Sequence, residues 1–222
     1  ILDGTPRKQM IKVMRPYQVY AASSIIDKVR QHDFDINDQE IGYIWHATGS
    51  GKTISSFKTA WLASRLPNVD KVIFLVDRVA LTNQTVDEYS AYDPEKGENG
   101  NGGVVTDAAN RWVLSKKIKS KGNGIIVTSI QKMAALVKDK KGINDIAKKN
   151  ILFIVDEAHR STAGDMLQSI KTTFTRSAWV GYTGTPNFDK APTTRDIFGN
   201  LIHAYTIVDA IRDGNVLGFK VD

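Results

Sequence analysis

The feature that most constrains the fold is a glycine-rich turn between a strand pattern and a helix pattern, in residues 41–53. An apolar run with β-branched and aromatic side chains, Ile41–Trp45, predicts a buried strand. The turn Thr48–Gly51 ends the strand, and from Lys52 onward apolar residues recur at helical spacing. A strand, a glycine turn and a helix that begins with Lys-Thr form the pattern of a phosphate-binding loop, or P-loop. The alternative, a chance turn before an amphipathic helix, leaves the combination of these features unexplained.

Each residue type in this loop has a physical reason to be there. Gly49 and Gly51 allow the torsions that turn consecutive N–H groups toward a phosphate, and the positive end of the helix dipole lies at the same place. Lys52 can reach the β- and γ-phosphates, and the Thr53 hydroxyl can bind Mg²⁺. The general pattern has glycine at position 46, where this chain has His46. The predicted nucleotide-binding loop comprises Gly49, Ser50, Gly51, Lys52 and Thr53.

Composition narrows the class of protein. The 222 residues are 41% hydrophobic and 24% charged, as in a globular α/β unit. No apolar run approaches the roughly 18 residues that a membrane span needs, and the N-terminus has no signal-peptide pattern. We expect a cytoplasmic protein without a membrane partner, which the absence of cysteine fits. A formal net charge of +6 favours a polyanionic partner such as nucleic acid.

Five apolar strand patterns alternate with helical patterns along the chain, which predicts an α/β fold whose parallel sheet is covered on both faces. The predicted strands are 41–45, 71–76, 124–128, 151–155 and 178–182. Polar clusters stand at the ends of these strands, namely the P-loop, Asp77-Arg78, Thr128-Ser129, Asp156-Glu157 and Thr183–Pro186. Because ligands bind at the carboxyl edge of such sheets, we expect the five clusters to share one edge.

Asp156 and Glu157 supply the second half of a predicted ATP-hydrolysing site. The Asp156 carboxylate can hold Mg²⁺ opposite Thr53, directly or through water, and Glu157 can orient and polarise the water that attacks the γ-phosphate. Phosphoryl transfer needs mainly positioning and charge neutralisation, which Lys52, Mg²⁺ and Glu157 supply. The alternative is that the two carboxylates cap a helix beginning near Ala163 or face solvent. The P-loop earlier in the chain favours the catalytic interpretation.

The histidines have different surroundings in the sequence. His159, predicted as a catalytic-site residue, can bond a polar group at a neighbouring strand end, such as Thr183 or Thr185. A lone histidine is nevertheless more often structural than catalytic. His32 and His203 have no polar cluster near them, and we expect both to be structural.

Four motifs together resemble superfamily 2 helicases and translocases: Arg15-Pro16-Tyr17-Gln18, the P-loop His46–Thr53, the DEAH box Asp156–His159, and Thr183–Pro186. The residues of these motifs resemble those of the motor (R) subunit of type I restriction–modification enzymes. His46, which departs from the general P-loop pattern, fits the P-loop motif of that subunit. The resemblance implies a three-layer, RecA-like P-loop NTPase domain in residues 15–222, the first of two motor lobes, after a linker in residues 1–14. It also implies ATP and Mg²⁺ as cofactors, double-stranded DNA as the track, and the modification and specificity subunits as partners.

The resemblance assigns further roles residue by residue. Gln18 matches the adenine-reading glutamine, with Arg15 and Tyr17 beside it, and an exposed glutamine at a helix start is the alternative. The segment that couples nucleotide state to DNA grip matches Thr183, Gly184 and Thr185.

Other residues match the motifs that hold the DNA backbone, namely Arg78, Thr128, Ser129 and Gln131. Hydroxyl and main-chain N–H groups at strand ends suit phosphate contacts without base readout. Ordinary turn capping is a serious competing interpretation for Thr128 and Ser129. The basic stretches 116–121 and 138–141 stay unassigned, because charge runs are usually solvated faces.

A complete motor of this kind needs more than 222 residues. The chain starts at Ile1, and we expect a fragment that lacks the second motor lobe, with its arginine finger, and the nuclease. We therefore expect residues 1–222 alone to bind ATP–Mg²⁺ weakly and to hydrolyse it poorly. One alternative is another superfamily 2 translocase, such as a type III restriction subunit, a repair helicase or a remodeller. The other is a non-catalytic nucleotide-gated binding module, which would have no need to retain the P-loop and DEAH carboxylates together.

Overall fold

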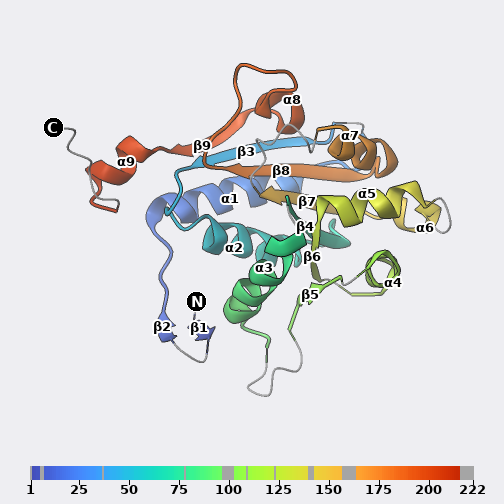
Figure 1. Cartoon of the computed structure of the whole chain (residues 1–222), viewed down its shortest axis with the longest axis horizontal. Helices are drawn as coiled ribbons and strands as arrows, with labels where there is room; N and C mark the ends of the chain where they lie inside the picture. The colour runs from blue at the N-terminus through green and yellow to red at the C-terminus, as the bar shows by residue number, and fades with distance from the viewer. Residues whose placement is uncertain are drawn as a thin grey trace.

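The computed structural model describes residues 2–5, 8–36, 38–77, 79–96, 103–108, 110–122, 124–139, 143–156 and 164–215. Within them a seven-stranded parallel sheet runs through the centre of the molecule, with helices on both faces (Figure 1). The order across the sheet is β5–β6–β4–β7–β8–β3–β9. These strands are β3 (Glu40–His46), β4 (Lys71–Val76), β5 (Val105–Asp107), β6 (Ile125–Ser129), β7 (Ile151–Asp156), β8 (Ser177–Thr183) and β9 (Leu201–Tyr205). The predicted three-layer α/β architecture is confirmed.

The interior strands are apolar throughout because both of their faces are covered. Successive side chains of a strand point to opposite faces of the sheet. In β4, Val72, Phe74 and Val76 enter the core on one face, and Ile73 and Leu75 enter the core on the other. All residues of β4 are buried. A strand of this kind appears in the sequence as an unbroken apolar run and not as an alternating one.

Two groups of helices cover the two faces. One face is covered by α1 (Pro16–Gln31), α2 (Lys52–Ala63) and α3 (Val79–Tyr92). The other is covered by α4 (Arg111–Lys119), α5 (Ile130–Lys138), α6 (Ile143–Ala147), α7 (Gly164–Thr173) and α8 (Thr194–Phe198). A last helix, α9 (Ile207–Arg212), follows β9, and α1 and α2 lie beneath β3 and β8 in Figure 1. None of the described helices has both the length and the apolar composition that a bilayer crossing requires.

The sequence patterns did not predict the strands at the two edges of the sheet. Both β5 and β9 have a single neighbouring strand, and most of their residues are partly exposed. A search for buried apolar runs therefore misses them. In residues 1–14, where the sequence predicts a linker or edge segment, β1 (Leu2–Thr5) and β2 (Lys8–Ile11) pair as an antiparallel hairpin.

The parallel arrangement brings the carboxyl ends of the strands to one edge. The P-loop follows β3, Asp156 ends β7, and Thr183 ends β8. In the sheet, β8 lies between β3 and β7. Segments far apart in the sequence thus meet at this edge, as the strand-end clusters predict.

Candidate functional site

The loop after β3 has the backbone of a phosphate-binding turn. Gly49 and Gly51 have φ angles of 82° and 80°, in the left-handed region that favours glycine. A Cβ atom on Gly49 would meet nothing within 4 Å, so the torsion, and not lack of space, favours glycine there. Gly51 is the N-cap of α2, and no side chain among the described residues caps this helix. The first turn of α2 is therefore arranged to receive an anion at the positive end of the helix dipole.

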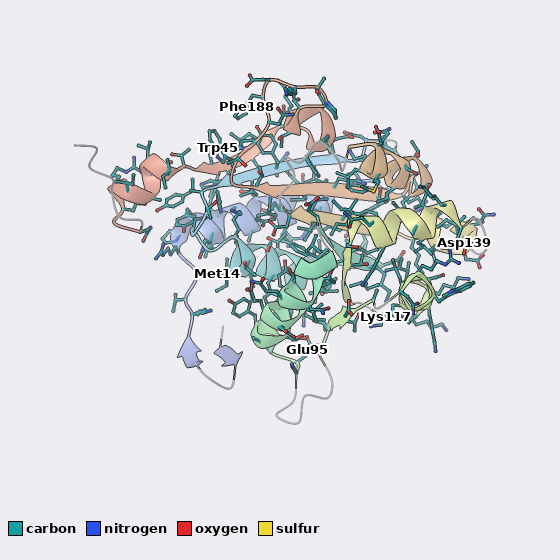
Figure 2. The ribbon with its side chains drawn as sticks, in the orientation of Figure 1. Met14, Trp45, Glu95, Lys117, Asp139 and Phe188 are labelled. Carbon is teal, nitrogen blue, oxygen red and sulfur yellow. The ribbon has the colours of Figure 1, made fainter. Side chains whose placement is uncertain are left out.

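Lys52 lies between the P-loop and the segment after β8. Its Nζ donates a hydrogen bond to the main-chain oxygen of His46 at 3.4 Å. A Cβ atom on Gly184 would lie 3.1 Å from the Lys52 Nζ, so the two segments approach closely. The Trp45 indole Nε1 donates to the Gly184 oxygen at 3.1 Å, and Phe188 packs against the edge of the Trp45 ring (Figure 2). The structure thus brings the P-loop and the predicted coupling segment together.

The coupling segment itself is a tight turn. Thr183 is fully buried at the end of β8, and its hydroxyl accepts a hydrogen bond from the N–H of Thr185 at 3.2 Å. Gly184 lies between them, against Lys52. Because of this close approach, a shift of the Lys52 side chain would change its contact with the turn.

Thr53 and Asp156 line one cavity of about 150 Å³. The other lining residues are Ser56, Phe74, Val76, Asp77, Gln84, Thr85, Glu88 and Tyr89. Mg²⁺ prefers oxygen ligands and often takes only one or two from the protein, with water and phosphate completing its shell. The described part of the chain contains no group of three or more His, Cys, Asp or Glu side chains that could hold a metal alone. A hydroxyl and a carboxylate on one cavity fit a Mg²⁺ ion that arrives with a phosphate.

Two buried tyrosines lie near the Asp156 carboxylate. Burial raises the pKa of Tyr89 and of Tyr182, and the negative charge of Asp156 raises both further. The Tyr89 hydroxyl is 2.8 Å from the Ser56 hydroxyl, and the Tyr182 hydroxyl is 2.8 Å from that of Thr59. Both tyrosines therefore stay protonated and uncharged at neutral pH, and Asp156 is the negatively charged group of the three.

Three of the predicted site residues, Arg78, Glu157 and His159, lie outside the described residues. In the sequence, Arg78 comes after Asp77, which directly follows β4, and Glu157 and His159 come after Asp156, the last residue of β7. Both positions are at the carboxyl edge of the sheet. The roles of these three residues stay predictions.

Gln18 is tied to the P-loop. The residue is 3% exposed, so the alternative of an exposed glutamine at a helix start is wrong. Its Nε2 donates to the main-chain oxygens of Ser50 at 2.8 Å and Gly51 at 3.2 Å, and its Oε1 accepts from the N–H of Arg15 at 2.8 Å. The Tyr17 hydroxyl also donates to the Ser50 oxygen, at 2.6 Å. Both amide hydrogens of Gln18 are thus used on the P-loop, while its Oε1 can accept a second hydrogen bond.

A second cavity, of about 420 Å³, opens beside the same loop. It is lined by Lys12, Gly51, Thr53, Ile54, Glu88, Ala91 and Tyr92. The Lys12 Nζ donates to the Tyr92 hydroxyl at 3.0 Å and lies 5.0 Å from the centroid of that ring. Sequence reasoning missed Glu88 and Tyr92, whose spacing of four residues places them on one face of α3.

His46 and His203 form a pair next to the P-loop, in which the His46 Nε2 and the His203 Nδ1 are 3.0 Å apart. No polar cluster surrounds His203 in the sequence, but β9 pairs with β3 and brings His203 beside His46, a contact that the sequence pattern did not reveal. Burial lowers the pKa of His46 to about 3, with repulsion from His203 and Lys52 contributing. Burial also lowers the pKa of His203. Both imidazoles are therefore neutral at neutral pH.

At the end of β6 two of the predicted DNA-contacting side chains, those of Ser129 and Gln131, make hydrogen bonds within the fold. Thr128 is fully buried, and its hydroxyl has no hydrogen-bond partner within the described residues. Ser129 caps α5 by accepting a hydrogen bond from the N–H of Lys132 at 3.2 Å, as the capping interpretation holds. The Gln131 Nε2 donates to the main-chain oxygen of Asp77 at 2.6 Å. Their contact with DNA stays a prediction.

Known proteins similar to this chain include ATPases and restriction subunits. The family model described as SWI2/SNF2 ATPase matches residues 17–221. The endonuclease subunit of the type I restriction enzyme SauCOLORF180P of Staphylococcus aureus (strain COL) is 40% identical over 228 residues, covering 100% of this chain and 23% of that subunit. The C-terminal part of the endonuclease subunit MpnIIP of Mycoplasma pneumoniae is 41% identical over 170 residues, covering 73% of this chain and 79% of that protein. The chain thus spans less than a quarter of the length of the S. aureus subunit.

Solved structures share the fold. A nuclease-deletion mutant of the Type ISP restriction-modification enzyme LlaGI, in complex with a DNA substrate mimic, superposes with a TM-score of 0.61 at 18% sequence identity. The match covers 92% of this chain and 21% of the LlaGI chain. At this identity the similarity concerns the architecture.

Proposed function

The chain belongs to the SWI2/SNF2 ATPase family and to the endonuclease subunits of type I restriction enzymes, and from this premise we propose its function. Residues 15–222 act as the first motor lobe of such a subunit, which binds and hydrolyses ATP and drives movement along double-stranded DNA before cleavage. The observation that carries the proposal is the single cavity lined by Thr53, directly after the P-loop Lys52, and by Asp156.

The residues of the site divide the work of phosphoryl transfer. The main-chain N–H groups of the P-loop bind the phosphates, because Gly49 and Gly51 hold the turn open toward an anion. The Lys52 Nζ exchanges the main-chain oxygen of His46 for the β- and γ-phosphates. Mg²⁺, when held by Thr53 and Asp156, neutralises charge on the phosphates.

The hydrolytic step falls to the DEAH residues beyond β7. Glu157 orients the attacking water in line with the γ-phosphate and accepts a proton from it, while the bond from the γ-phosphorus to the bridging oxygen breaks and ADP leaves. His159 bonds a polar group of the coupling segment, such as Thr183 or Thr185. Through that bond, and through the contact of Gly184 with Lys52, the presence of the γ-phosphate is transmitted to the end of β8.

The adenosine part of the nucleotide extends into the second cavity. Thr53 and Glu88 line both this cavity and the cavity of Asp156, and Gly51 of the P-loop lines this one, which supports a nucleotide that reaches into both. The second lone pair of the Gln18 Oε1 accepts from the adenine amino group, with Arg15 and Tyr17 beside it. The Glu88 carboxylate, which lines both cavities, can accept from the ribose hydroxyls.

DNA is the proposed track, with the modification and specificity subunits as partners in a cytoplasmic restriction complex. The net charge of +6 supports a polyanionic partner, and a protein of the same fold has been solved with a DNA mimic. Arg78, Thr128, Ser129 and Gln131 form the proposed DNA-contacting end of the edge. Thr128 and Ser129 are fully buried whereas Gln131 is exposed, so Gln131 is the described residue of this set that a DNA phosphate can reach.

Two other functions are separated by specific observations. Another superfamily 2 translocase, of type III restriction, repair or remodelling, would use the same lobe but a different chain around it, and the similarity to type I endonuclease subunits argues against it. A non-catalytic nucleotide-gated module would need the P-loop but no carboxylate on the Mg²⁺ side. The position of Asp156 on the Thr53 cavity argues against that module.

The test is Glu157→Gln in the intact protein. The variant keeps the shape of the side chain but cannot accept a proton, so ATP binding should persist while hydrolysis falls by about 100-fold or more. Glu95→Gln is the matched control, because Glu95 pairs with Arg65 and lies well away from Trp45 in Figure 2. Turnover of the wild type should rise with double-stranded DNA more than with single-stranded DNA. Unchanged hydrolysis in Glu157→Gln would remove this residue from its role.

A further inference from the structure

We propose that His203 and Tyr205, on the edge strand β9, are positioning residues that hold the P-loop in its nucleotide-binding shape. The two residues are two apart in a strand, so their side chains point to the same face. That face meets α1, where the Tyr205 ring stacks on Tyr17 and the His203 ring lies 5.3 Å from that of Tyr20. The proposal rests on nucleotide binding by the P-loop.

His203 holds the start of the loop. Its Nδ1 is 3.0 Å from the Nε2 of His46, the fully buried last residue of β3. The main-chain oxygen of His46 in turn accepts from the Lys52 Nζ. The pair therefore fixes the residue on which the P-loop lysine rests.

The hydrogen-bond inventory of the pair assigns the proton. Two neutral imidazoles that face each other need one N–H and one lone pair between them. The His46 Nδ1 is buried and has no hydrogen-bond partner within the described part of the chain. A buried N–H without an acceptor is rarer and costlier than a buried lone pair without a donor. We therefore assign the proton to the His46 Nε2, which donates to the His203 Nδ1, so that residue 203 must offer an acceptor at its δ position.

Tyr205 holds the middle of the loop. Its ring stacks on Tyr17 with centroids 3.6 Å apart and an interplanar angle of 6°. The Tyr17 hydroxyl donates to the Ser50 oxygen at 2.6 Å, inside the P-loop. The Tyr205 hydroxyl is itself fixed, 3.0 Å from the Asp213 carboxylate and 2.6 Å from the Asn215 Nδ2. The ring that supports Tyr17 is thus anchored from behind.

Together the two contacts hold the P-loop at His46 and at Ser50. A loop that is already in its binding shape does not lose conformational freedom when the nucleotide arrives, and this raises affinity. If a substitution releases the loop, the loop must become ordered when the nucleotide binds, and this ordering reduces the binding free energy. Removal of either interaction should therefore weaken nucleotide binding more than it slows the chemical step of bound nucleotide.

The experiment compares three substitutions at one position in the intact protein, namely His203→Asn, His203→Gln and His203→Leu. Asparagine offers an oxygen acceptor at the δ position, where His203 offers the Nδ1 lone pair, whereas the glutamine oxygen lies one bond further out and leucine offers no acceptor. We expect His203→Leu and His203→Gln to raise the dissociation constant of a fluorescent ATP analogue about tenfold, with kcat within about twofold of wild type. His203→Asn should bind within about threefold of wild type.

Two further sets of variants separate positioning from simple packing. Tyr205→Phe keeps the ring that stacks on Tyr17 but loses the bonds of its hydroxyl to Asp213 and Asn215, so it should bind the analogue more weakly than the wild type and more tightly than Tyr205→Leu. Tyr205→Leu should bind it about as weakly as His203→Leu. His32→Leu is the control, because His32 packs edge-on against Phe34 and belongs to the opposite end of α1. It should lower the melting temperature without changing the dissociation constant.

Several results would overturn the proposal. Equal affinity in all three His203 variants would remove His203 from the role, and equal weakening in all three would show that only packing matters there. A fall in kcat with an unchanged dissociation constant would contradict the assignment to binding. A wild-type protein that binds the analogue but does not hydrolyse ATP would contradict the proposed function while the affinities still decide the role of β9. A wild type that does not bind the analogue would contradict both.

Discussion

Two ends of the same sheet edge use their polar residues differently. At the P-loop end, where β3, β8 and β9 lie side by side, polar side chains converge on one loop: Gln18 and Tyr17 bond its carbonyls, and Lys52 reaches back to its start. At the other end, Ser129 caps a helix and Gln131 bonds the chain after β4. In the sequence both ends show the same pattern, a polar cluster directly after an apolar strand. The signal locates the edge but does not tell a ligand site from a structural cap.

The largest effect that this comparison predicts is at Lys52. Lys52→Ala removes a cation aimed at the phosphates, and ATP hydrolysis should fall by about 100-fold or more, as for other preorganised charge-stabilising groups. The substitution also removes the hydrogen bond from the Lys52 Nζ to the His46 oxygen, 3.4 Å long, and the melting temperature records the effect on the fold. Steady-state hydrolysis and a thermal melt measure the two outcomes.

Lys58→Ala is the matched control for Lys52→Ala. Lys58 is on the same helix, but its Nζ lies 4.0 Å from the centroid of the Trp61 ring and not at the loop. Burial lowers the pKa of Lys58, and Arg65 nearby lowers it further, so this lysine also belongs to a partly enclosed site. Hydrolysis should stay within about twofold of wild type. Equal decreases in the two variants would mean that Lys52 acts through stability.

A middle effect is expected at His46, where site and fold meet. Its pKa is about 3 in the folded protein against 6.5 for the ordinary side chain. Because the folded pKa is the lower one, the unfolded chain takes up the proton first as the pH falls below 6.5. The stability that depends on neutral His46 is present above that pH and is lost toward the folded pKa. Between pH 6.5 and 5.5 the free energy of unfolding should fall by about 1 kcal/mol from this group alone.

His46→Gln isolates that contribution. Glutamine can still bond His203 through its terminal amide but does not titrate, so the substitution should flatten the curve by about 1 kcal/mol over the same pH interval. Urea unfolding at a series of pH values gives both curves, and carboxylates that titrate in each protein cancel in the difference. Parallel curves would show that His46 is already protonated or solvated when folded.

The interior of the fold could be predicted from the sequence because it is built from complete apolar runs. Strands such as β4 and β7 are buried on both faces, so their sequences are almost entirely apolar. Edge strands do not: β9 mixes an exposed Leu201 with half-buried residues, so nothing marks it as a strand. Without β9 in the predicted sheet, the partner of His46 could not be found either.

The site could be predicted where chemistry dictates residue types, and not where geometry chooses among equals. The proposed phosphate and metal roles specify Lys52 and Thr53, and both residues stand at the start of α2, where the pattern puts them. Gln18 could equally have been exposed, and only the packing of α1 on α2 turned its amide onto the loop. Glu88 and Tyr92 enter a cavity because α3 passes beside the start of α2, which helical spacing alone does not say.

The smallest effect belongs to the other end of the edge, at Ser129. Ser129→Ala removes the hydroxyl that accepts from the N–H of Lys132, and the removal of such a cap typically costs about 1 kcal/mol in the free energy of unfolding. Ser129→Gly should cost only about a few tenths of that, because glycine tolerates the cap position well. If the side chain is only a cap, DNA affinity and its dependence on salt should not change in either variant.

A change in DNA binding at Ser129 would break the comparison between the two ends. A serine hydroxyl carries no charge and releases no counterions, so the loss of its hydrogen bond to a phosphate would lower DNA affinity at every salt concentration and leave the slope of log affinity against log salt unchanged. A fall in affinity of this kind in Ser129→Ala, with stability unchanged, would make the hydroxyl a DNA ligand, as the motif implies. Unchanged affinity with lowered stability would leave the hydroxyl as the cap of α5 alone.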